Sequence, residues 1–243
     1  MRSTVLVVAL ALSLAACASP EQPATTPVDS TAALAAVRPN AQNPANFPQL
    51  EVPPGWTARF DHDDAEYVIG SNADSSDVFF VTMTPGWHVT TKPAGVFWHP
   101  ASTTTGDFSV VSKFHLFQPG ERNEGYGVFF GGSDLAGASQ SYVYFLVRRT
   151  GEFLVKKRTG ETTVALIDWT ANPAIVPFTA ETAGTATNAL KVTVSAGTIH
   201  FLVNDVEVGS LPAAGMPTDG IAGLRINHEL NLHVEEFAVE AAQ

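Results

Sequence analysis

The chain has 243 residues, 45% of them hydrophobic and 15% charged, with a formal net charge of −11. This negative charge excludes a protein that binds along the phosphate backbone of a nucleic acid. A single cysteine excludes an intramolecular disulfide framework and a cysteine-based zinc knuckle. The length is sufficient for one large β domain with its own hydrophobic core.

The first 16 residues have the pattern of a secretory signal. Arg2 supplies a positive charge, and the apolar run Val5–Ala16 follows it. Its twelve residues are too few for a transmembrane helix, which needs roughly 20. A run of this length between a basic start and small residues is typical of a signal peptide. We therefore expect residues 1–16 to be removed from the mature protein.

The signal ends in the sequence Leu-Ala-Ala-Cys at residues 14–17, which resembles the bacterial lipobox. The resemblance implies that Cys17 is lipidated and anchors the protein in the bacterial cell envelope. It also implies the outer membrane as destination, because Ala18 rather than an acidic residue follows the cysteine. The alternative is a chance cysteine after an ordinary signal peptide.

A tether is predicted between the lipidated Cys17 and the folded part, so that residues 17–54 carry no fold of their own. Residues 18–54 hold eight of the 16 prolines of the chain and none of its 19 glycines. Prolines spread among Ala, Thr and Gln favour an extended, solvated backbone. We expect a single folded domain over residues 55–243.

From Trp56 onward the hydrophobic residues recur with a period of two, which predicts β-strands. The segment 107–117 shows this most clearly, with one apolar face formed by Phe108, Val110, Phe114 and Leu116. Turn-forming pairs recur along the chain, at Thr150-Gly151, Thr159-Gly160, Ala196-Gly197, Asn204-Asp205 and Asp219-Gly220. The pattern predicts an all-β jelly-roll sandwich of two antiparallel sheets.

Three segments together resemble the concanavalin A-like lectin/glucanase superfamily: Trp56–Phe60, the hairpin Leu190–Asp205, and the closing segment Gly220–Phe237. The likeness leans toward its laminin G-like and 3-keto-disaccharide hydrolase-like branches. It implies a jelly roll whose C-terminal strand pairs beside the N-terminal one. It also implies a ligand site on the concave face of the domain.

The chemistry of the retaining glucanases in this superfamily is not expected. They carry Glu-x-Asp-x-x-Glu on one strand, and this spacing does not occur here. Glu235 and Glu236 are adjacent, so we expect their side chains on opposite faces of a strand. His228 and His233 are five residues apart and, on a strand, face opposite sides. The sequence therefore predicts neither a metal site nor a cofactor.

Two histidines that each follow a tryptophan, His88 and His99, are candidate ligand-binding residues. One interpretation buries both tryptophans in the core and leaves the histidines capping loops. The other turns the histidines into a groove. The remaining candidates for the lining of that groove are Tyr126, Tyr144, Arg148 and Arg225.

The strand predicted over residues 142–148 carries the strongest argument for a groove. Val143, Phe145 and Val147 share one wholly apolar face, so this face is expected in the core. Tyr144 and Arg148 then point to a groove or to solvent. Sugar rings stack on aromatic faces, and their hydroxyls bind polar side chains.

Two further segments have competing interpretations. The glycines of Gly125–Asp134 indicate close packing of strands rather than room for a ligand. The basic residues of 148–149 and 156–158 form a solvated face or, alternatively, a site for an anionic sugar or a lipid headgroup.

The function that these observations favour is a membrane-anchored lipoprotein that binds carbohydrate, with no nucleic-acid partner. Two alternatives stay open. One is a glycoside-processing enzyme of the keto-sugar hydrolase or lyase type, with a His or Glu as general base. The other is a structural or adhesive lipoprotein without a small ligand.

The lipid anchor is tested by replacing Cys17 with Ala. We expect this variant to leave the membrane fraction, because residues 18–54 contain no other apolar segment long enough to hold it. Cell fractionation and immunoblotting measure the change, with Ser19→Ala as the control. A Cys17→Ala protein that still sediments with membranes would contradict the anchor.

Overall fold

The computed structural model describes residues 51–61, 67–72, 75–119 and 121–241. The signal peptide, Cys17 and the tether up to residue 50 lie outside the described residues. At the start of the described part, the Thr82 amide donates to the carbonyl of Glu51 over 3.1 Å, so the chain already contacts the domain there. Within these residues we find no helix with the length and hydrophobicity that crossing a bilayer requires.

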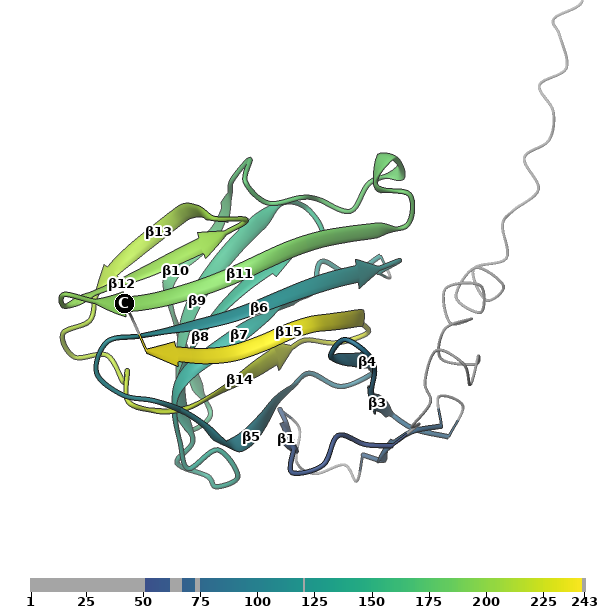
Figure 1. Cartoon of the computed structure of the whole chain (residues 1–243), viewed down its shortest axis with the longest axis horizontal. Helices are drawn as coiled ribbons and strands as arrows, with labels where there is room; N and C mark the ends of the chain where they lie inside the picture. The colour runs from purple at the N-terminus through teal and green to yellow at the C-terminus, as the bar shows by residue number, and fades with distance from the viewer. Residues whose placement is uncertain (1–50, 62–66, 73–74, 120, 242–243) are drawn as a thin grey trace, which may run out of the picture.

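The described residues form two sheets that pack face to face (Figure 1). The seven-stranded sheet has the order β1 (Thr57–Phe60), β5 (Gly95–Thr104), β14 (Gly220–Ile226), β7 (Gly125–Ser133), β8 (Ser141–Arg148), β9 (Glu152–Thr159), β10 (Thr162–Ala171). The eight-stranded sheet has the order β13 (Val206–Pro212), β12 (Thr198–Val203), β11 (Thr185–Ser195), β6 (Phe108–Phe117), β15 (Asn231–Ala241), β4 (Trp87–Thr91), β3 (Val78–Thr82), β2 (Ile69–Gly70). The described part contains one short 3₁₀ helix, Ala180–Thr182.

The core lies between the two sheets and follows the predicted alternation. The apolar face of β6 is buried as expected, and Val143, Phe145 and Val147 of β8 meet it from the other sheet. The turn predicted at Asn204-Asp205 joins β12 to β13, and both residues have positive φ, 51° and 65°. The predicted jelly-roll sandwich is therefore confirmed, and among the described strands every pair is antiparallel except β2 with β3, which is parallel.

Two expectations about the closing strand are wrong. β15 pairs with β6 and β4 in the eight-stranded sheet, whereas β1 pairs with β5 at the edge of the other sheet. A register shift interrupts β15 between Val234 and Glu236. This bulge places Glu235 and Glu236 between two core residues and near Lys113, and not on opposite faces.

The seven-stranded sheet is buried on its outer face as well, the face turned away from the eight-stranded sheet. On β8, Tyr142, Tyr144 and Leu146 point to this side and are all buried. They belong to a second apolar cluster that comprises Val96, Trp98, Phe129, Leu135, Tyr142, Tyr144, Leu146 and Leu154, with Trp169 and Ile221 packed against it. Other segments of the chain therefore cover this second cluster on the outer side of the sheet.

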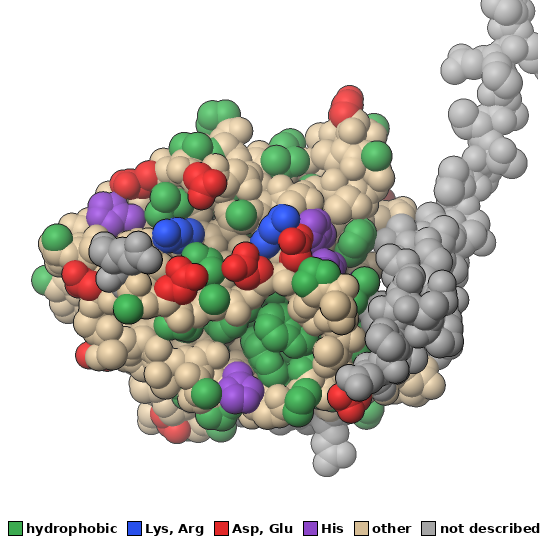
Figure 2. Space-filling model, viewed as in Figure 1, with side chains coloured by type: hydrophobic (Ala, Val, Ile, Leu, Met, Phe, Trp, Pro, Cys, Tyr) green, Lys and Arg blue, Asp and Glu red, His purple; other side chains and the backbone are tan. Residues whose placement is uncertain are grey.

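The outer face of the eight-stranded sheet carries interspersed charged and histidine side chains (Figure 2). Three histidines lie in register across it: His88 on β4 opposite His233 on β15, and His233 opposite His115 on β6. The His115 and His233 rings are 5.4 Å apart. Burial, together with the nearby charge of His115, lowers the pKa of His233.

This lowered pKa predicts acid sensitivity. The fold favours neutral His233, so its contribution to stability is present above the unfolded pKa of about 6.5 and declines as the pH falls below it. We expect the chain to lose stability between pH 7 and pH 5, and His233→Gln to lose less over the same interval. Urea unfolding at both pH values measures this.

The matched control for this test is His200→Gln, since His200 lies on β12 with a partly exposed side chain, paired with Glu207. That variant should show the acid loss of the parent chain. An equal acid loss in His233→Gln would refute the role of His233.

Candidate functional site

A groove of about 340 Å³ opens on the outer face of the seven-stranded sheet, above the second apolar cluster. Strands β14, β8, β9 and β10 supply its floor, and the segments that precede β2, β7 and β15 supply its rim. The lining residues are Asp61, Arg122, Asn123, Glu124, Tyr144, Leu146, Leu154, Lys156, Arg158, Thr163, Trp169, Arg225, Asn227 and His228. This volume is at the lower end of the range for ligand pockets, roughly 300–1,000 Å³.

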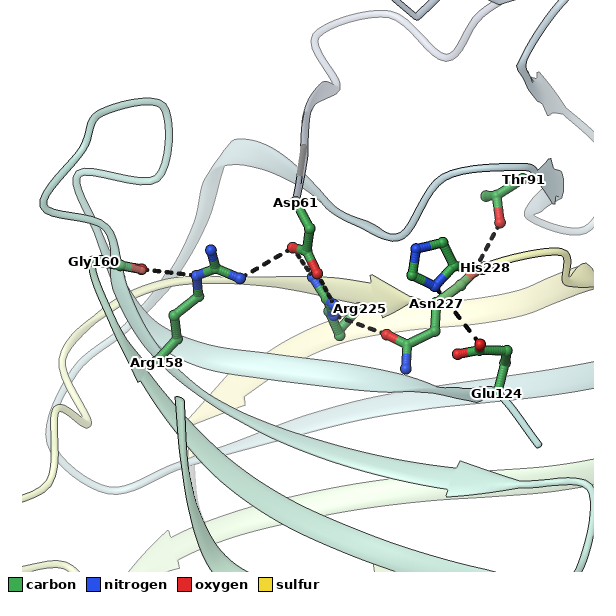
Figure 3. Close-up of polar contacts among 8 residues, drawn as sticks. All are labelled: Asp61, Thr91, Glu124, Arg158, Gly160, Arg225, Asn227 and His228. Carbon is green, nitrogen blue, oxygen red and sulfur yellow. Dashed lines mark hydrogen bonds and ion pairs between the residues drawn. The ribbon is translucent and has the colours of Figure 1, made fainter. Parts of the chain in front are cut away.

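Asp61 is held at the groove by two arginines (Figure 3). Arg225 donates from Nη1 and Nη2 to the two carboxylate oxygens, at 2.6 and 2.5 Å. Arg158 donates from Nη1 to Oδ1 at 3.1 Å and from Nε to the carbonyl of Gly160 at 2.9 Å. The two arginine side chains are only 7% and 10% exposed, so the carboxylate neutralises charge that water does not reach freely.

The protonation states in the groove follow from this pairing. Burial alone would raise the pKa of Asp61, but the hydrogen bonds and charge of Arg225, with the charge of Arg158, bring it below its ordinary value. Burial alone would lower the pKa of Arg225, but Asp61 and the nearby tyrosines raise it. Burial raises the pKa of Tyr144. At neutral pH the groove therefore contains a charged Asp61 carboxylate, a charged Arg225 guanidinium and a neutral Tyr144 phenol.

The rim on the side of β15 is polar. The Asn227 side-chain oxygen accepts from Nε of Arg225 at 3.1 Å, and the Thr91 hydroxyl donates to the Asn227 carbonyl at 2.9 Å (Figure 3). His228 Nδ1 is 3.7 Å from Oε1 of Glu124. Among the described residues, no group of three or more His, Cys, Asp and Glu side chains is placed to hold a metal ion.

Trp169 forms an aromatic wall of the groove. The Arg148 guanidinium lies 4.3 Å from the centre of its ring, and Glu152 binds that guanidinium through two hydrogen bonds of 2.8 and 2.7 Å. Gly125 lies close to the edge of the ring, because a Cβ at this position would be 2.9 Å from Cη2 of Trp169. This contact agrees with the interpretation of the glycine-rich segment as close packing.

Three of the residues predicted for a ligand site lie together on this outer face. Tyr144 and Arg225 line the groove, and the Arg225 guanidinium is 5.7 Å from the centre of the Tyr144 ring. Arg148 is adjacent and contacts the groove through Trp169. Their role in binding stays a prediction.

The other three are not brought to the groove. Tyr126 faces the inter-sheet core, where Asn188 donates to its hydroxyl, and burial raises its pKa to about 12. His88 lies in the eight-stranded sheet, 3% exposed, between Phe79 and Phe117. The expected convergence of His88 with Arg148 does not occur, because β4 and β8 belong to different sheets.

His99 is the last of these three. Although it lies on β5 of the seven-stranded sheet, its ring packs over Gly55, and its Nδ1 accepts from the Ala101 amide at 3.2 Å. It therefore caps the end of the domain near β1, as the simpler interpretation of the Trp-His pairs held.

Sequence reasoning missed Asp61 and Trp169 as groove residues. Asp61 stands in an acidic run of the sequence, and its arginine partners are 97 and 164 residues away. Lys156 and Arg158 belong to the basic residues that the sequence analysis singles out, and alternation along β9 places both side chains on one face of the strand. Nothing in the sequence pairs that face with Asp61.

The comparisons with known proteins establish the fold. No protein-family model and no curated protein matches the chain. Among solved structures, the carbohydrate-binding module CBM66 from Bacillus subtilis is similar, with a TM-score of 0.54, 12% identity, and coverage of 79% of this chain and 97% of that one. A Bacillus subtilis protein of unknown function with a galectin-like fold has a TM-score of 0.51 and 16% identity, over 76% of this chain and 88% of that one.

At these identities the similarity concerns the fold alone. The described domain shares the β-sandwich fold of these two proteins, the second of which is described as galectin-like. A shared fold does not assign a ligand, which has to be argued from the groove itself.

The Asp61 pairing predicts a large stability effect. Asp61→Asn leaves two buried guanidinium groups without their counter-ion, and we expect a loss of about 3 kcal/mol in the free energy of unfolding at pH 7. Because folding lowers the pKa of Asp61, its contribution is present above the unfolded value of about 3.9 and is lost as the pH falls through the folded value. The difference between the two chains should therefore shrink in strong acid.

Urea unfolding at pH 7 and at pH 2–3 tests this prediction. The control is Asp168→Asn, an exposed carboxylate on β10, which should change stability by about 0.5 kcal/mol or less. An Asp61→Asn chain as stable as this control at pH 7 would show that the pairing contributes nothing.

Proposed function

We propose that the protein is a cell-envelope lipoprotein whose jelly-roll domain binds carbohydrate in the groove on the outer face of the seven-stranded sheet. The observation that carries the proposal is the half-buried ring of Trp169 in a groove lined with hydrogen-bonding side chains. Sugars need this combination, since a pyranose has apolar C–H faces and a circumference of hydroxyl groups.

The groove offers both kinds of contact. Trp169 supplies an aromatic face, while Asp61 and the Asn227 side chain supply oxygens that accept hydrogen bonds from sugar hydroxyls. Arg158 and Arg225 supply donors whose positions the ion pairs with Asp61 already determine. The fold shared with CBM66, described as a carbohydrate-binding module, supports the same proposal.

The anchor and the tether belong to this proposal. A lipid on Cys17 would hold the protein in the outer membrane. Residues 18–50 would then separate the domain from it by as much as roughly 100 Å, at about 3.1 Å per residue of extended chain. A tether of this length would let a binding module contact polymeric glycan at different distances from the membrane.

A second candidate is a glycoside-processing enzyme. The pair of Glu124 and His228 at the rim, 3.7 Å apart, favours it, since a carboxylate beside an imidazole can act as general acid or base. Chromatography of a bound glycan after prolonged incubation separates the two functions. Release of product that stops in both Glu124→Gln and His228→Ala would support the enzyme, whereas an unchanged glycan would leave the binding function.

The binding proposal is tested at Trp169. We expect Trp169→Ala to weaken glycan binding about tenfold, equivalent to about 1.4 kcal/mol, and Trp169→Phe to retain most of the affinity because it keeps an aromatic face. A glycan array identifies the ligand, and calorimetric titration measures the affinity of each variant.

Val164→Ala is the matched control, because Val164 lies on the same strand, is 57% exposed and does not line the groove. It should bind as the parent chain does. A glycan bound equally by Trp169→Ala and the control would place the binding site elsewhere. The absence of binding to any glycan would favour the structural or adhesive alternative.

A further inference from the structure

The groove has the opposite charge sign to the chain as a whole. Its described lining contains the cations Arg122, Lys156, Arg158 and Arg225 against the carboxylates Asp61 and Glu124, an excess of two positive charges from Arg, Lys, Asp and Glu. The whole chain has a net charge of −11. A positive groove in an acidic protein concentrates positive potential at one place on its surface.

Most of these charges are already paired within the described part of the chain. Asp61 forms ion pairs with both Arg158 and Arg225. Glu124 forms one with Arg122, in which Oε1 and Nε are 3.0 Å apart. For Lys156, the structure shows no ion pair with another described residue. Among the described residues, Lys156 is thus the groove cation that has no carboxylate partner.

The position of Lys156 is set by β9. It is in register with Tyr144 of β8 on one side and with Ala165 of β10 on the other. Its neighbour two residues earlier, Leu154, points to the same face and belongs to the apolar cluster under the groove. The side chain of Lys156 therefore lies on the groove face of β9, beside Tyr144 and Leu154.

We propose that the groove selects acidic saccharides, and that Lys156 is the specificity-determining residue that binds the carboxylate of a uronic acid. This inference rests on the proposed carbohydrate function and adds the class of sugar. A charge-assisted hydrogen bond from an ammonium to a carboxylate is roughly twice as strong as a neutral one. A neutral sugar would leave the Lys156 charge partly desolvated without a partner.

The test compares acidic polysaccharides with their own carboxyl-reduced, neutral forms. Polygalacturonate, alginate, glucuronoxylan and hyaluronan are each titrated in both forms. We expect the parent chain to prefer an acidic form over its reduced form by at least about tenfold at low salt, and this preference to fall as NaCl is added.

Two adjacent lysines provide the variant and its control. Lys156→Gln should lose most of the preference for the acidic form, while its affinity for the reduced form stays near that of the parent. Lys157→Gln should keep the preference, because Lys157 points to the other side of β9 and does not line the groove. Circular dichroism and urea unfolding verify that both variants fold.

The outcomes separate the two proposals. Equal binding of acidic and reduced forms, or a preference that survives Lys156→Gln, would overturn the acidic specificity and leave carbohydrate binding in place. Tight binding only of sulfated glycans would overturn the choice of carboxylate. If the chain binds no polysaccharide in either form and no member of the glycan array, the proposed function fails together with the inference.

Discussion

Strand β8 is apolar on both faces, and this constraint shapes the rest of the domain. One face, with Val143 and Phe145, forms the inter-sheet core, as in any sandwich. The other face, with Tyr142, Tyr144 and Leu146, also has to be removed from water. Loops from distant parts of the chain therefore fold over the outer side of the seven-stranded sheet, and the groove is the part of that side which they leave open.

Covering this face brings charges into partly buried positions. Arg158 and Arg225 extend over the tyrosines, and their charge would be costly without a counter-ion. Asp61 supplies it, and so joins the segment after β1 to β9 and β14. The ion pairs of Asp61 with these two arginines stabilise the segments that lie over the outer face. They also orient hydrogen-bond donors and acceptors at the groove. A substitution at Asp61 consequently reports on folding, because the carboxylate is the counter-ion of both buried arginines.

The sequence predicts the sandwich because alternation needs no knowledge of distant contacts. It places Val143, Phe145 and Val147 in the core and turns Tyr144 and Arg148 to the other side, as observed. Tyr126 shows where this reasoning fails. β7 is buried along nearly its whole length, so its pattern does not say which face meets the other sheet.

The site depends on information that one strand does not contain. Alternation assigns a side chain to a face, but not the strand to a sheet. His88 was therefore expected beside Arg148, although its strand lies in the opposite sheet. Asp61 and its two arginines come from three segments, and their meeting follows from topology alone.

The stacking of Arg148 on Trp169 has a consequence for binding entropy. Glu152 binds the guanidinium, the guanidinium lies over one face of the indole, and Gly125 lies close to the edge of the ring at Cη2. The ring is thus restrained before any ligand arrives. Immobilising a mobile side chain on binding costs conformational entropy, and the fold already restricts the rotation of Trp169 before binding. A ligand that stacked here would meet a preorganised surface.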